Sequence, residues 1–138
     1  MSETGSEKNG IRVSGGRERN LLKLFPQIQG YYSPRVIGEV NDVYVKITRV
    51  LGDDVPWHTH DFEDEMFYMV KGSLQMELKG KPGFTLNEGE YFIVPHGVEH
   101  RVSSENECWI LLIEPKATKH TGSVNSKITK NIEEQLGQ

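Results

Sequence analysis

The amino-acid sequence predicts an all-β fold, an antiparallel sandwich or barrel, with short helical segments near both ends of the chain. Several short segments between residues 35 and 115 alternate between apolar and polar side chains, which is the period of a β-strand. Glycine, proline, asparagine or serine bounds these segments. No helical stretch in this region is long enough for the crossover that parallel strands require. Many short strands at close spacing are typical of a sandwich or barrel.

The first 34 residues are expected to lie outside the barrel. Residues 1–16 are rich in glycine and polar side chains and cannot bury enough apolar surface to become ordered, so they are predicted to form a disordered tail. Residues 17–34 form an N-terminal segment with a short helix. Asn20 is placed to cap this helix, whose apolar residues are Leu21, Leu22, Leu24 and Phe25, and Pro26 is expected to end it.

Residues 35–115 are expected to form the barrel. Val43, Val45 and Ile47 alternate with polar or amphipathic neighbours and predict the first clear strand. The later predicted strands are Glu65–Lys71, Ser73–Leu78, Phe84–Leu86, Tyr91–Val94, His100–Ser103 and Glu107–Glu114.

Residues 116–138 form a C-terminal extension. Ile128, Ile132 and Leu136 are spaced four residues apart, so they share one face of a helix, and Gly137 stands where a helix would end. The pattern predicts a short helix docked on the barrel.

Composition and length exclude several classes of protein. The chain has 138 residues, of which 26% are charged, and its net charge is −4. No apolar run approaches the roughly 18 residues of a membrane span, and the polar first residues do not resemble a secretory signal. The single cysteine, Cys108, excludes an internal disulfide and is typical of a reducing compartment. We therefore expect one cytoplasmic domain that binds a small molecule, no membrane and, because it lacks a basic stripe, no nucleic acid.

Histidines and a carboxylate form the first candidate site. Residues i and i+2 of a strand point to the same face, so His58 and His60 are expected to present their imidazoles side by side. Glu65 opens an apolar strand, where burying an unpaired carboxylate would be costly, and a cation held by the two histidines would pair with it. His100, which opens a strand after the turn Pro95–Gly97, is a further candidate ligand. Two histidines and a carboxylate bind iron in non-haem enzymes, but manganese, nickel and zinc accept the same donors.

The other histidines and nearby acidic residues have an ordinary structural interpretation. A His-x-His pair alone also occurs by chance on surface strands. His96 lies in a turn and His120 in a polar segment, so both are expected at the surface. Three acidic residues before Glu65 are expected in a solvated loop: Asp61, Glu63 and Asp64. Cys108 lies in an apolar strand and is expected to be a buried thiol without a nucleophilic role.

The spacing of two motifs resembles that of the cupin superfamily. The first motif matches at every fixed position, with glycine at Gly52 and Gly72, the His-x-His pair at His58 and His60, and the glutamate at Glu65. The second motif matches at Gly89, Pro95, Gly97 and His100, but Ser104 stands where the motif has asparagine. This departure affects a loop contact and leaves the ligand positions intact.

The resemblance implies a small single-domain cupin, that is, a double-stranded β-helix, or jelly-roll barrel. It implies one divalent transition metal ion, iron, manganese, nickel or zinc, held inside the barrel by His58, His60, Glu65 and His100. Such small cupins are often homodimers in which a partner covers the exposed sheet edges, so a homodimer is expected.

The function that follows is metal-dependent chemistry on a small carbonyl- or carboxylate-bearing metabolite, of an isomerase, epimerase or lyase type. Two alternatives remain open, an Fe(II) dioxygenase and a non-catalytic cupin that binds or senses a small ligand. A likeness to sugar-phosphate isomerases is only a fold-level label, because a fold does not fix a function. A phosphate substrate would need a cationic clamp, for which Lys46, Arg49 and Lys71 are candidates.

A general acid or base would come from the polar side chains on the predicted strands. These are Tyr44, Lys46, Arg49, Tyr68, Gln75, Glu77 and Arg101. The sequence alone does not indicate which two of them would act together as acid and base. Strand parity directs Arg101 away from His100, so it is expected to face outward, and it places Phe67 and Met69 on the face of Glu65. The two tyrosines are expected to serve sheet packing.

Overall fold

The structure is a computed structural model that describes residues 7–8, 11–12, 16–122 and 124–137. Its strands are β1 (Glu7–Lys8), β2 (Ile11–Arg12), β3 (Arg35–Val40), β4 (Val43–Gly52), β5 (Glu65–Lys71), β6 (Leu74–Leu78), β7 (Phe84–Leu86), β8 (Tyr91–Val94) and β9 (His100–Pro115). The helices are α1 (Leu21–Leu24), the 3-10 helix η1 (Phe25–Gln27) and α2 (Ile132–Gln135). Among the described residues, no helix has both the length and the apolar character needed to cross a membrane.

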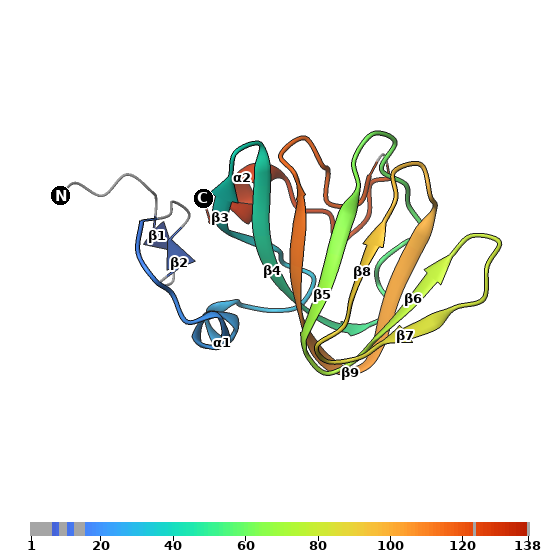
Figure 1. The fold of residues 1–138 in the computed structure, drawn as a ribbon, viewed down its shortest axis with the longest axis horizontal. Coiled ribbons are helices and arrows are strands. Elements are labelled where there is room, and N and C mark those ends of the chain that lie inside the picture. The colour runs from blue at the N-terminus through green and yellow to red at the C-terminus, as the bar shows by residue number, and fades with distance from the viewer. Residues whose placement is uncertain (1–6, 9–10, 13–15, 123, 138) are drawn as a thin grey trace.

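Antiparallel strands form the predicted jelly-roll barrel (Figure 1). One layer has the order β3-β4-β9-β5-β8, and β6 pairs with β9 and β7 in the other. Short strands with period-two patterns and turn residues between them explain this architecture. In β5, for example, Glu65, Phe67 and Met69 are buried while Met66 and Tyr68 between them are only half-buried. Phe67 and Met69 therefore share the inner face with Glu65, as predicted.

Strand β9 is one strand, whereas the sequence predicted two, His100–Ser103 and Glu107–Glu114. Its first part pairs with β6, from His100 opposite Leu78 to Ser103 opposite Gln75. Its later part lies between β4 and β5. The polar stretch between these parts stays extended because it finds backbone partners in β4, where Ser104 pairs with Gly52. The hydroxyl of Ser104 also donates to the carbonyl oxygen of Val50 at 3.1 Å. β9 thereby joins the two layers around one interior.

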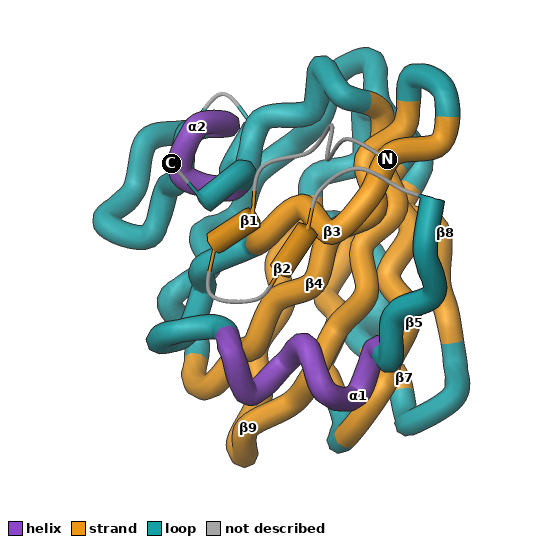
Figure 2. The backbone as a smooth tube through the Cα atoms, turned by 90° about the vertical axis from the view of Figure 1, so that its left-hand side faces the viewer, coloured by secondary structure: helices purple, strands orange, loops and turns teal. Residues whose placement is uncertain are grey.

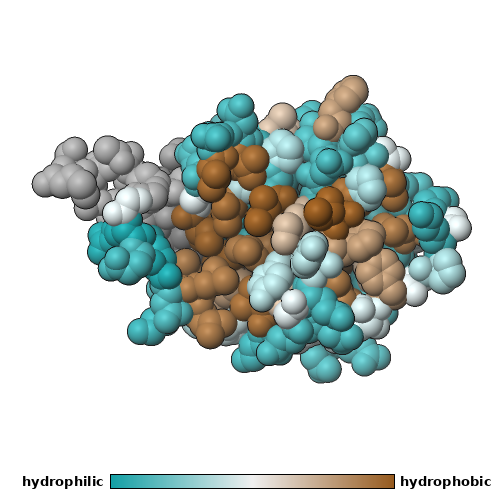
Figure 3. All heavy atoms as spheres, in the orientation of Figure 1, coloured by the Kyte–Doolittle hydropathy of each residue, from teal (hydrophilic) through white to brown (hydrophobic). Residues whose placement is uncertain are grey.

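The N-terminal segment packs on the outside of the barrel (Figure 2). Helix α1 is shorter than predicted, and the side chain of Asn20 makes no capping hydrogen bond. Pro26 does not stop the turn but lies at the start of η1, where a missing N–H costs nothing. The ring of Phe25 stacks on Trp109 of β9 with centroids 4.8 Å apart. Figure 3 shows apolar side chains gathered on this face, over β4 and β9.

The two ends of the chain depart from the sequence expectations in different ways. Most of the predicted tail at residues 1–16 lies outside the described residues, and β1 and β2 pair with each other. Helix α2 is only one turn long. Asn131 and Glu134 form a capping box that starts it at Ile132, and Gly137, with φ of +85°, follows its end. Ile128 is buried as predicted, but it precedes the helix and does not belong to it.

Candidate metal centre

Four side chains from three parts of the fold meet inside the barrel. His58 and His60 lie in the segment before β5, Glu65 begins β5 and His100 begins β9. The predicted strand at His58–His60 is wrong, since only His58 makes a backbone bridge, with N–H···O distances of 3.0 and 2.9 Å to and from His100. That bridge brings the two motifs together. The turn before His100 contains Gly97, whose φ of +78° is readily adopted only by glycine.

The distances among the four side chains suit one metal ion. One donor atom of each residue can be chosen so that all lie within 4.8 Å of one another, and all four residues are buried. Oε1 of Glu65 lies 3.5 Å from Nε2 of His60 and 3.5 Å from Nε2 of His100. With bonds of about 2.1 Å, ligand atoms of one ion are about 3 Å apart when adjacent and about 4 Å apart when opposite. Small side-chain shifts would therefore place all four atoms around an ion.

Backbone carbonyls orient two of the histidines. Nδ1 of His58 lies 2.8 Å from the carbonyl oxygen of Pro56, and Nδ1 of His100 lies 3.0 Å from that of Val98. A carbonyl oxygen only accepts hydrogen bonds, so in a neutral ring Nδ1 carries the proton and the Nε2 lone pair stays free. This contact from the non-ligating nitrogen is typical of metal-binding histidines.

Several polar atoms in this cluster have no hydrogen-bond partner among the described residues. They are Nδ1 and Nε2 of His60, Oε1 of Glu65 and Nε2 of His100. Each buried polar atom left without a partner costs about 1–3 kcal/mol, so a cluster of them is unfavourable in an apolar barrel. A cation shared by Glu65 and the imidazoles would satisfy Oε1 of Glu65, Nε2 of His100 and one of the two nitrogens of His60. The residues present therefore fit a metal ion.

The electrostatics keep donors in the form that binds metals. Burial, and then the neighbouring His100, lower the pKa of His58 to about 4, so this ring is neutral at pH 7. Burial alone would raise the pKa of Glu65, but the adjoining imidazoles of His100 and His60 hold it well below its ordinary value. Glu65 is therefore ionised. Neither residue must lose a proton at neutral pH before a cation binds.

A second buried polar group lies beside the first. Nζ of Lys46 in β4 lies 3.0 Å from Oε2 of Glu114 in β9 and also donates to the side-chain oxygen of Gln135 in α2. Burial and the nearby negative charge of Glu65 raise the pKa of Glu114 well above its ordinary value. Glu114 and Gln135 were not predicted as site residues. Strand parity could have indicated Glu114, because Cys108, Ile110 and Leu112 before it all face inward.

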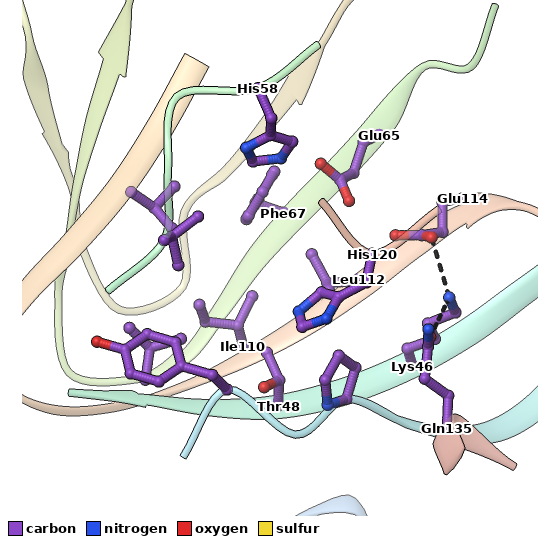
Figure 4. A pocket seen from close by; sticks show the side chains of 15 residues that line it. Lys46, Thr48, His58, Glu65, Phe67, Ile110, Leu112, Glu114, His120 and Gln135 are labelled. Carbon is purple, nitrogen blue, oxygen red and sulfur yellow. Dashed lines mark hydrogen bonds and ion pairs between the residues drawn. The ribbon is translucent and has the colours of Figure 1, made fainter. Parts of the chain in front are cut away.

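Both polar groups open onto one cavity of about 50 Å³ (Figure 4). Apolar walls come from residues such as Phe67, Ile110 and Leu112. His120 also lines this cavity and is half-buried, so the prediction that it lies at the surface is wrong. The sequence neighbours of His120 are polar, so they gave no sign that the C-terminal segment folds against the barrel. Of the three proposed phosphate-binding cations, only Lys46 reaches the cavity, where Glu114 neutralises it.

The other candidate side chains lie away from the cavity. Arg101 faces outward as predicted and pairs with Glu77 at 2.6 Å, while Arg49 pairs with Glu107 on the outer face. Lys71 lies over the ring of Trp109. The remaining candidates, Tyr44, Tyr68 and Gln75, are also absent from the cavity lining.

Two predictions about burial are confirmed, a buried thiol at Cys108 and an exposed imidazole at His96. Cys108 is fully buried, and burial raises the pKa of its thiol to about 11, which is unfavourable for a nucleophile. His96 is exposed, and its Nδ1 lies 2.9 Å from Asp64, which is exposed as well. The histidines thus differ in burial, with three buried at the metal centre, His120 half-buried and His96 exposed.

Comparisons with known proteins agree with the fold and the motif spacing. Residues 48–114 match the family model described as "Cupin domain". The chain is 30% identical over 98 residues to the uncharacterized protein YdbB of Bacillus subtilis, covering 71% of this chain and 86% of that protein. The structure of a cupin-2 domain containing protein from Shewanella frigidimarina is similar, with 38% identity, a TM-score of 0.67 and coverage of 70% of this chain and 93% of that one. Protein NMB1881 from Neisseria meningitidis gives 32% identity, a TM-score of 0.66 and coverage of 72% and 99%.

Proposed function

The chain belongs to the cupin superfamily, and on that premise we propose that it binds one divalent transition metal ion and acts with it on a small carbonyl- or carboxylate-bearing metabolite. The ion would be held by His58, His60, Glu65 and His100. The observation that carries this proposal is the set of buried donor atoms without hydrogen-bond partners that converge beside the cavity. The reaction would be of an isomerase, epimerase or lyase type.

A bound divalent ion supplies Lewis-acid chemistry, by which it polarises a carbonyl or stabilises an enediolate. The protein's own residues supply the surroundings. Phe67, Ile110 and Leu112 exclude water from the wall of the cavity, which strengthens electrostatic interactions within it. Glu114 lies at the polar end, where it pairs with Lys46, and its raised pKa makes its carboxylate a stronger proton acceptor than an ordinary one.

The size of the cavity limits the substrate. A water needs about 10–15 Å³ of such space, so a cavity of about 50 Å³ holds roughly three to five waters. A ligand that displaces them would be a small metabolite. The neutralised Lys46 offers no free cation for a phosphate group, which favours a carbonyl or carboxylate as the polar group of the substrate.

The proposal is tested by elemental analysis of protein purified without a histidine tag. We expect close to one equivalent of iron, manganese, nickel or zinc in the wild type. We expect that metal to be lost in His58→Ala and retained in the control variant His96→Ala, whose imidazole is exposed. Absence of metal, together with failure to bind iron, manganese, nickel or zinc on reconstitution, would refute the proposal and favour a binding module.

The identity of the metal would distinguish two enzyme classes, an isomerase, epimerase or lyase and an Fe(II) dioxygenase. The same donor set and apolar walls suit Fe(II) and O₂, so an iron-containing protein would be tested next for substrate-dependent oxygen uptake. A zinc- or manganese-containing protein would be tested for isomerisation and elimination on small hydroxy and keto acids. Turnover in either assay that His58→Ala abolishes would assign the class.

A further inference from the structure

His120 occupies a position in the cavity that the metal centre does not explain. It comes from the C-terminal segment after β9, beyond residues 48–114 that match the family model. Its ring lines the same cavity as His58, Glu65 and Glu114. Figure 4 shows the imidazole projecting into that space beside Ile110 and Leu112.

The hydrogen bond of His120 to the backbone fixes which ring nitrogen can donate. The backbone N–H of Lys130 donates to Nδ1 of His120 at 2.9 Å. An N–H group can only donate, so Nδ1 carries a lone pair, and the proton of a neutral ring must be on Nε2. Burial, and then the positive charge of Lys46, lower the pKa of His120 to about 4, so the ring is neutral at pH 7.

The Nε2–H group is thus a fixed donor without an acceptor among the described residues. Among the residues that the structure describes, this ring makes one hydrogen bond, and it uses Nδ1. The neighbouring polar groups of the cavity are otherwise engaged, since Lys46 contacts both Glu114 and Gln135. An acceptor for Nε2–H must therefore come from water or from a ligand in the cavity.

The C-terminal segment that carries His120 packs against the loop that carries His58 and His60, which we call the metal-binding loop. An added Cβ at Gly122 would overlap the backbone carbonyl oxygen of Thr59, the residue between His58 and His60. The segment therefore passes Thr59 at backbone contact two residues after His120. Because of this close packing, the position of His120 relative to the metal ligands is set by the fold.

From these observations we infer that His120 is a specificity-determining residue whose Nε2–H donates a hydrogen bond to a carbonyl or carboxylate oxygen of the ligand. This inference rests on the proposed function, since it takes the ligand to lie in the cavity beside the metal ion. It adds a contact from the C-terminal segment to those of the barrel. A ligand that has an acceptor oxygen at this position would be selected over an apolar molecule of the same size.

Two variants separate ligand binding from a merely structural role. The side-chain oxygen of His120→Asn is two bonds from Cβ, as Nδ1 is, so it can still accept from Lys130 but leaves no donor at the place of Nε2. The side-chain nitrogen of His120→Gln is three bonds from Cβ, as Nε2 is, so it restores the donor and not the acceptor. If His120 only holds the backbone of Lys130, the Asn variant should bind the ligand more like the wild type than the Gln variant does. If His120 binds the ligand, the Gln variant should be the closer of the two to the wild type.

The experiment loads each protein with Co(II), counts bound cobalt, and then titrates pyruvate and oxalate while recording the visible spectrum of the cobalt. We expect equal cobalt content in wild type, His120→Asn, His120→Gln and the control His96→Asn. We expect Kd for the probe that binds to rise roughly ten- to hundredfold in His120→Asn, to rise less in His120→Gln and to stay unchanged in the control.

The possible failures are distinguishable. A wild type that takes up no cobalt would overturn the proposed function and this inference with it. A wild type that takes up cobalt but binds neither probe would overturn the inference alone. The inference would also be wrong if His120→Asn bound the probes as the wild type does, or if His120→Gln were the weaker of the two variants.

Discussion

Replacing Gly122 by alanine is expected to displace the C-terminal segment from the metal-binding loop. Gly122 has φ of +61°, and a Cβ added there would overlap the carbonyl oxygen of Thr59 and lie 3.1 Å from its carbonyl carbon. Both atoms belong to the backbone, so no side-chain rotation relieves the overlap. Either the segment carrying His120 moves outward or Thr59 moves, and with it the loop that holds His58 and His60.

The magnitude follows from two contributions. A non-glycine residue in the left-handed region costs about 1–2 kcal/mol, and overpacking against an immovable neighbour costs about 1–3 kcal/mol more. The sum is about 2–5 kcal/mol. For a chain of this length about 1 kcal/mol lowers Tm by roughly 3–5 °C, so we expect Gly122→Ala to lower Tm by about 6 °C or more.

Gly80 provides a matched control. Its φ is +78°, and a Cβ added there would meet nothing within 4 Å, so Gly80→Ala carries only the backbone contribution. The assay is differential scanning fluorimetry of both variants with and without added metal, together with proteolysis of the C-terminal segment. We expect faster cleavage and weaker metal retention in Gly122→Ala only. Equal Tm values and equal cleavage rates in the two variants would refute the packing argument.

Two further predictions concern ion pairs. Lys46→Met leaves Glu114 buried without its cation and should lower the free energy of unfolding by about 3 kcal/mol in urea titrations. Lys116→Met, which removes an exposed pair, should lower it much less, and equal losses would contradict the assignment of a buried pair. Hydrogen bonds from Arg49 and Trp109 lower the pKa of Glu107 from its ordinary value of 4.5 to about 2. Because the folded value is the lower one, these contacts stabilise the fold above about pH 4.5 and lose that effect as the pH falls towards 2. Urea titrations at pH 6 and pH 2.5 should therefore show that the stability difference between wild type and Glu107→Gln, at most about 1 kcal/mol, shrinks at the lower pH, and a constant difference would disprove the coupling.

The strands and the metal ligands could be predicted because both are encoded over short stretches of sequence. Short apolar segments bounded by turn residues identified β5 and β8 with the observed bounds. The spacing of His58, His60, Glu65 and His100 identified a cluster that the structure brings within 4.8 Å. The same local patterns predicted two strands where β9 is continuous. The polar residues 104–106 resembled a turn, and the backbone partner of Ser104, which is Gly52 in β4, is distant in sequence. The metal and a homodimer stay predictions.

By itself, the sequence indicated an antiparallel sandwich or barrel, because alternation acts through the local geometry of strands, and its resemblance to the cupin motifs indicated which four residues converge in it. Only the tertiary structure decided what else faces the cavity. Lys46 and Gln135 are 89 residues apart and carry no shared pattern, yet they meet through a buried hydrogen bond. His120 reaches the cavity because the C-terminal segment packs against Thr59 at Gly122. Such contacts depend on how a segment without periodicity docks on the finished barrel, and that docking is fixed by long-range packing.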